Sequence, residues 1–102
     1  MGGYALTTDE EFVWRVGRGE VTLRRAGDAW TVKYTAVGRL LGPRQVLYEA
    51  LHRDPTHAAW EVMARVVHVT RDEEDGVRAG RSAVQWLKAQ PPPAKSDPAV
   101  SQ

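Results

Sequence analysis

The sequence predicts a single α+β domain, an antiparallel sheet of about five strands with one C-terminal helix packed on one face. Two observations predict this class. Residues 11–37 alternate apolar and polar side chains in three short runs separated by glycine-containing turns, which is typical of a strand meander. Residues 72–88 place apolar side chains at three- and four-residue spacing behind an acidic start, which is typical of an amphipathic helix.

The meander consists of runs at residues 11–16, 20–25 and 29–37. Gly17-Arg18-Gly19 forms the first turn, and Gly27-Asp28 is suited to a two-residue hairpin loop. Thr8 followed by Glu11 also matches a capping box, which would open a short helix instead. We favour a strand, because the run after Thr8 is β-branched and aromatic and stops quickly at glycine.

The central part of the chain allows two interpretations. Residues 45–53 alternate like a strand, but they also contain good helix formers behind Pro43. After Asp54-Pro55, which is able to cap a helix, residues 60–69 alternate and become β-branched towards their end. We favour a strand at 60–69, paired with 45–52 as a hairpin through a loop at 53–58.

The final helix has the clearest boundaries. Negative charge from Asp72 to Asp75 suits a helix N-terminus, which explains the acidic cluster without a bound cation. Gly76 and Gly80 share a face, which predicts close packing of this helix on the sheet. The expected apolar stripe consists of Val77, Gly80, Ala83, Val84 and Leu87.

We expect residues 4–89 to form the domain and residues 90–102, with four prolines, to form a disordered tail. The sequence contains no apolar run of membrane-spanning length and no cysteine, which predicts a cytoplasmic protein without membrane contact. It also lacks Ile and Asn, and Arg outnumbers Lys eleven to three. This usage indicates a GC-rich bacterial genome, although the loss of Asn and Cys would also suit a thermophile.

No catalytic motif is present. The chain has no GxSxG, no nucleophilic cysteine, no dinucleotide fingerprint and no phosphate loop, so a non-catalytic protein without a cofactor is expected. His52, His57 and His68 lack the spacing of a metal site, so no metal is expected.

Positive charge is concentrated early in the chain. Residues 13–45 carry seven basic and two acidic side chains, whereas residues 46–76 carry three basic and seven acidic ones. A basic, aromatic-flanked sheet face is suited to single-stranded nucleic acid, because cations contact phosphates and rings stack on bases. This alternative function would use Arg15, Arg24, Arg25 and Lys33.

Self-association is the favoured function, as a non-catalytic homodimeric interaction module. A helix about 24 Å long and 10 Å wide covers only two or three strands spaced about 4.8 Å apart. Val66 to Val69 would be apolar on both strand faces, and Trp86, one of four tryptophans, lies at the edge of the helical stripe. The expected interface residues are Val67, Val69 and Trp86.

Overall fold

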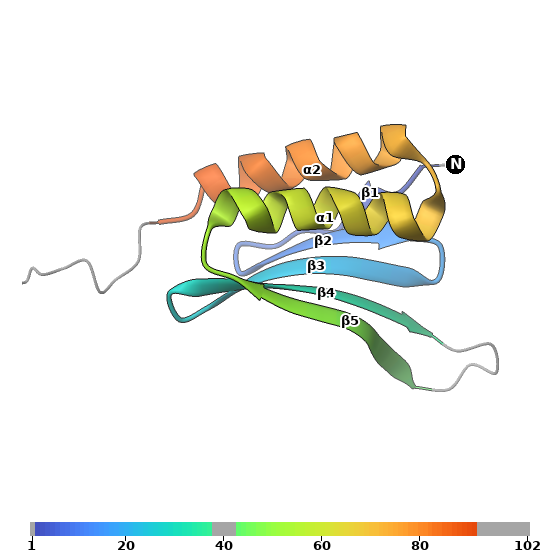
Figure 1. Cartoon of the computed structure of the whole chain (residues 1–102), viewed down its shortest axis with the longest axis horizontal. Coiled ribbons are helices and arrows are strands. Elements are labelled where there is room, and N and C mark those ends of the chain that lie inside the picture. The colour runs from blue at the N-terminus through green and yellow to red at the C-terminus, as the bar shows by residue number, and fades with distance from the viewer. Residues whose placement is uncertain (1, 38–42, 92–102) are drawn as a thin grey trace, which may run out of the picture.

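The computed structural model describes residues 2–37 and 43–91 as a twisted five-stranded antiparallel sheet with two helices side by side on one face (Figure 1). The α+β class predicted from the sequence is confirmed, but the helix count is two. The strands lie in the order in which they follow one another along the chain. The elements are β1 (Tyr4–Ala5), β2 (Glu11–Val16), β3 (Gly19–Ala26), β4 (Ala29–Val37), β5 (Arg44–His52), α1 (Pro55–Thr70) and α2 (Glu73–Lys88).

The predicted meander is confirmed as β2, β3 and β4. Gly17 and Gly27 have φ values of 58° and 65°, which glycine adopts without strain, and each opens a tight connection between strands. Thr8 does not open a helix. Its hydroxyl accepts a hydrogen bond from the Glu11 N–H at 3.2 Å, which closes the turn that leads into β2.

The predicted strand at 60–69, and its hairpin with 45–52, is wrong. Residues 45–52 belong to strand β5, but residues 55–70 form helix α1. The Asp54 carboxylate caps this helix by accepting the Thr56 N–H at 2.8 Å. Its buried side chains, Ala58, Ala59, Val62 and Val66, follow helical spacing. The valines therefore tolerate a helix, because burial against the sheet outweighs their preference for strands.

The fifth strand is β1, a two-residue strand that the sequence analysis did not identify. It pairs antiparallel with β2, with Tyr4 opposite Arg15 and Ala5 opposite Trp14. With β1 at one edge and β5 at the other, the meander lies in the middle of the sheet.

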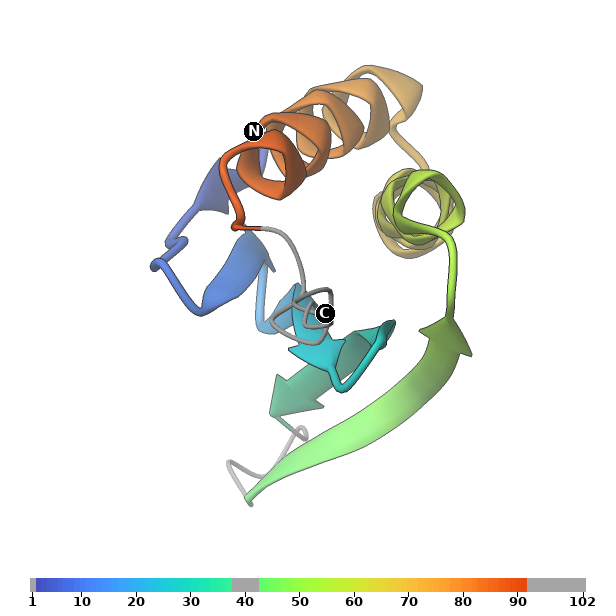
Figure 2. The same ribbon diagram turned by 90° about the vertical axis from the view of Figure 1, so that its left-hand side faces the viewer.

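The core lies between the helices and the three central strands (Figure 2). Helix α1 packs on β2 to β5, and α2 packs on β1 and β2. The two helices of one chain thus cover most of one face of the sheet. The uncovered apolar surface that was expected with a single helix is therefore largely absent. The buried cluster consists of Phe12, Trp14, Val16, Val21, Leu23, Trp30, Val32, Ala58, Ala59, Val62, Val66, Ala79, Ala83 and Trp86.

The predicted stripe of α2 is only partly correct. Gly80 and Ala83 are buried, but Val77 and Val84 are exposed. The side of α2 that packs inward is shifted by about one residue from the predicted stripe. It consists of Asp75, Gly76, Ala79, Gly80, Ala83 and Trp86.

Gly76 is where the two helices approach most closely. A Cβ atom there would overlap Cγ2 of Val67 and lie 3.1 Å from the Met63 carbonyl oxygen of α1. The close approach predicted for Gly76 and Gly80 is real, but their neighbour is a helix and not the sheet. The absence of a side chain at Gly76 lets both helices share one sheet face.

We predict that Gly76→Ala destabilises the fold by about 1–3 kcal/mol, because the overlap with α1 forces the helices apart. Helix propensity alone predicts the opposite sign, a gain of about 1 kcal/mol. Urea unfolding measures the difference. Gly80→Ala is the matched control with a smaller expected loss, because its added Cβ would meet only the Met63 side chain, at 3.1 Å. A Gly76→Ala protein more stable than wild type would contradict the packing argument.

Candidate functional site at the edge strand

Strand β5 carries three of the four exposed large apolar side chains in the described strands, the fourth being Tyr4 of β1. Val46, Leu47 and Leu51 are 53%, 59% and 62% exposed. Within the described sheet, β5 pairs only with β4, so its other edge presents unpaired backbone groups. Apolar side chains and an open hydrogen-bonding edge therefore occur on the same strand.

The pairing of β5 with β4 contains an irregularity that increases this exposure. Tyr34 lies opposite Tyr48 and Thr35 opposite Val46, so Leu47 has no partner in β4. A bulge of this kind leaves its extra residue outside the ladder and bends the strand.

Helix α1 holds the helix-facing side of β5 through a polar cluster. This β5–α1 polar cluster consists of Tyr48 and His52 from β5 and of Glu61 and Arg65 from α1. The Arg65 guanidinium lies 3.3 Å from Oε2 of Glu61 and 3.7 Å from the centre of the Tyr48 ring. Nε2 of His52 lies 3.9 Å from the Glu61 carboxylate, beyond hydrogen-bonding range. The apolar core thus ends at β4, and charged and aromatic contacts hold β5.

The same cluster raises the pKa of Tyr48 above its ordinary value. The main cause is the interaction of the phenol with the nearby Glu61 carboxylate, which favours the protonated phenol, followed by burial and by the negative charge of Glu61. Arg65 acts in the opposite direction but is outweighed.

The four predicted basic residues divide between the two sides of the sheet. Residues paired across an antiparallel ladder share a face, so Arg15, Arg24 and Lys33 lie on the open face, the sheet face without helices. Arg25 pairs with Trp30 on the helix side, and its guanidinium lies 4.7 Å from the centre of that ring.

Each of these three open-face cations has an acidic neighbour across the ladder. Arg15 forms an ion pair with Glu20 at 3.4 Å, Arg24 lies opposite Glu11, and Lys33 lies opposite Glu49. The open face therefore alternates in charge. The rings of Phe12, Trp14, Trp30 and Tyr34 lie on the helix side, so only Tyr4 among the described aromatic residues accompanies these cations.

The three predicted interface residues already have packing partners within one chain. Trp86 is 9% exposed, packs near Phe12 and Trp30, and donates its indole N–H to the Thr8 carbonyl at 2.9 Å. Val67 faces Gly76, and Val69 packs against the core. The exposed large apolar side chains lie elsewhere, on β5, on the outer side of the helices, and near the N-terminus at Tyr4 and Leu6.

Asp75 is a buried carboxylate whose role the sequence analysis missed. It is 2% exposed and accepts hydrogen bonds from Gly3 N–H at 2.8 Å, Trp14 Nε1 at 3.4 Å and Arg78 at 3.1 Å. The acidic run was interpreted only as complementing the helix dipole. Helical spacing could have predicted the burial of Asp75, because Asp75 shares a face with Ala79, Ala83 and Trp86.

In the described ranges, no group of three His or acidic side chains is arranged to hold a metal ion. No helix in that part of the chain has the length and apolar character needed to cross a membrane. Comparison with models of known protein families, with curated proteins and with solved structures finds no match to this chain.

We predict that the stabilising effect of the Tyr48 hydroxyl disappears at alkaline pH. Because the folded-state pKa is raised, its contribution is complete below the unfolded-state pKa of about 10 and is lost as pH rises through the folded-state value. Tyr48→Phe should lower the free energy of unfolding by about 1 kcal/mol near neutral pH. Urea unfolding as a function of pH should show that the difference in free energy of unfolding between wild type and Tyr48→Phe disappears in strong alkali.

The Glu61→Gln background is the control for this prediction. If Glu61 causes the effect, the two substitutions are coupled and the loss from Tyr48→Phe shrinks in that background. An identical loss in both backgrounds would exclude Glu61 as the cause.

Proposed function

We propose that this chain is a non-catalytic interaction module that forms a homodimer through β5. The observation that carries the proposal is an unpaired edge strand with three exposed large apolar side chains, Val46, Leu47 and Leu51. We also propose that it works in a bacterial cytoplasm, which is supported by the absence of cysteine and the preference for Arg over Lys.

The composition of β5 suits pairing better than solvent. Natural sheets protect edge strands with proline, charged side chains (lysine above all), bulges or a covering segment. Strand β5 is nine residues long and has neither proline nor lysine, and its bulge and the charges of Arg44 and Glu49 still leave Val46, Leu47 and Leu51 exposed. An exposed apolar edge of this kind pairs with a strand of another chain unless another segment covers it.

A second copy of β5 is a complementary partner. An antiparallel pair with its two-fold axis between Val46 and Leu47 sets Arg44 opposite Glu49 of the second copy, twice. Both residues lie on the open face, since Arg44 pairs with Val37 and Glu49 with Lys33 in β4. The same register sets Val46 opposite Leu47. Charge and apolar matches therefore coincide, and the two sheets become one continuous sheet.

Helix α1 carries a further exposed apolar side chain near the end of β5. Trp60 is 62% exposed and lines a shallow hollow together with His52, the last residue of β5. Tryptophan is enriched among the residues that contribute most to protein interfaces. Trp60 is therefore a second candidate contact of the module, apart from the strand pair itself.

We predict that the wild-type chain is a dimer at micromolar concentration and that Leu47→Lys weakens the association at least about tenfold, because it places a charge in the apolar centre of the strand pair. Sedimentation equilibrium measures both. Val84→Lys, which charges an exposed valine on α2, is the matched control and should leave the dimer intact. A wild-type chain that stays monomeric, or a dimer lost only in Val84→Lys, would refute the role of β5.

Binding of single-stranded nucleic acid is the second candidate function. It is favoured by Arg15, Arg24 and Lys33 sharing the open face, and disfavoured by the acidic residue opposite each of them. Arg24, Arg25 and Lys33 line a hollow of about 140 Å³ that also contains Glu11 and Glu49, so three of the four predicted cations meet there. Such a mixed surface attracts phosphate less than a uniformly basic one.

If this second function operates, the chain binds DNA or RNA oligonucleotides at about 50 mM salt and loses affinity steeply as salt increases. Arg24→Glu combined with Lys33→Glu then abolishes binding, because it reverses both charges. Fluorescence anisotropy measures the affinity. Failure to bind at low salt would eliminate this function.

A further inference from the structure

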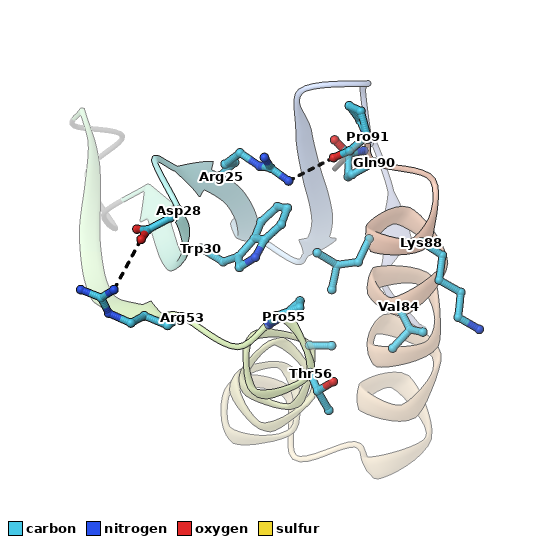
Figure 3. A pocket seen from close by; sticks show the side chains of 12 residues that line it. Arg25, Asp28, Trp30, Arg53, Pro55, Thr56, Val84, Lys88, Gln90 and Pro91 are labelled. Carbon is cyan, nitrogen blue, oxygen red and sulfur yellow. Dashed lines mark hydrogen bonds and ion pairs between the residues drawn. The ribbon is translucent and has the colours of Figure 1, made fainter. Parts of the chain in front are cut away.

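A pocket of about 550 Å³ opens at the end of the molecule where the β3–β4 turn, the start of α1 and the end of α2 meet (Figure 3). Ligand pockets typically measure about 300–1,000 Å³, with an apolar lining and a few polar groups that orient the ligand. This pocket lies away from the open face and takes no part in the proposed strand pairing.

The floor of the pocket is apolar and rigid. It includes the buried Trp30 and Ala59 and the half-buried Leu87. Trp30 is held from two directions, by the Arg25 guanidinium at 4.7 Å and by the edge-on ring of Trp86 at 5.9 Å. Such a preformed surface suits the body of an apolar ligand, since little order has to be gained on binding.

The rim of the pocket is cationic. Arg25, Arg53 and Lys88 line it, with Asp28 as the single carboxylate. Asp28 lies 3.5 Å from the Arg53 guanidinium and thus already has a cationic partner. The remaining positive charge has no acidic neighbour within the lining and is complementary to an anion.

Two polar contacts limit the size of the ligand. On one side of Trp30, Arg25 donates a hydrogen bond to the Pro91 carbonyl at 3.3 Å, and on the other side Arg53 contacts Asp28 (Figure 3). They frame an opening above the indole ring that suits a small molecule.

We propose that this pocket binds a small organic anion with an apolar body, such as a medium-chain carboxylate. The apolar body lies on Trp30, Ala59 and Leu87, and the anionic group contacts Arg25, the lining cation that lies beside Trp30 and is not paired with Asp28. The inference is independent of dimer formation, so it is tested on the wild-type chain and on the Leu47→Lys variant in parallel.

The experiment is a titration with octanoate, followed by the NMR signal of the Trp30 indole N–H. We expect saturable shifts in both proteins, and weaker binding of 1-octanol, which has the same chain without the charge. Arg25→Glu should weaken octanoate binding at least about tenfold, because it removes the charge-assisted contact to the anionic group. Arg18→Glu, at an exposed cation in the β2–β3 turn at the other end of the meander, should have no effect.

Four outcomes would overturn the proposal. They are no saturable shift, octanol binding as tightly as octanoate, a loss in Arg18→Glu equal to that in Arg25→Glu, and binding only to a chain that ends at Pro91. The last outcome would mean that residues 92–102 of the same chain occupy the pocket.

Discussion

The close packing of α1 against α2 at Gly76 is the constraint on which the rest of the structure depends. The backbone of α2 approaches Met63 and Val67 of α1 so closely that no side chain fits between them. Two helices therefore fit over the central strands, and together they bury most of the large side chains on that face of the meander, with Tyr34 partly buried. Separation of the helices would expose the core between them.

The same geometry explains why β5 differs from the other strands. The two helices bury the helix-facing side chains of β2, β3 and β4, whereas β5 meets only α1, through Tyr48, Glu61 and Arg65. Polar contacts of this type position a strand while contributing less apolar burial than a packed core. Val46, Leu47 and Leu51 are the apolar side chains left over, and they motivate the proposed dimer.

Charge is distributed to match this division of the molecule. On the open face Arg15, Arg24 and Lys33 each lie opposite an acid, which suits a solvated surface. Around the end pocket the cations outnumber the acids, and here they lie above an apolar floor. The surplus positive charge of residues 13–45 is thus only partly a property of the sheet face, because Arg25 belongs to the pocket.

The sequence by itself determined the features that depend on neighbouring residues. The meander, its turns at Gly17 and Gly27 and the bounds of α2 follow from local alternation, glycine and an acidic first turn. Only the tertiary structure decided the state of residues 55–70, because their valines suit a strand and their capping residues suit a helix. The helix forms because its apolar side chains are buried against the apolar face of the sheet.

The candidate site was predictable only in part, for the same physical reason. Alternation correctly assigned Arg15, Arg24 and Lys33 to one face, because side-chain direction in a strand is a local property. The burial of Trp86, the carboxylate network of Asp75 and the exposure of β5 each depend on segments distant in the chain. Local pattern determines which way a side chain points, and long-range packing determines whether anything covers it.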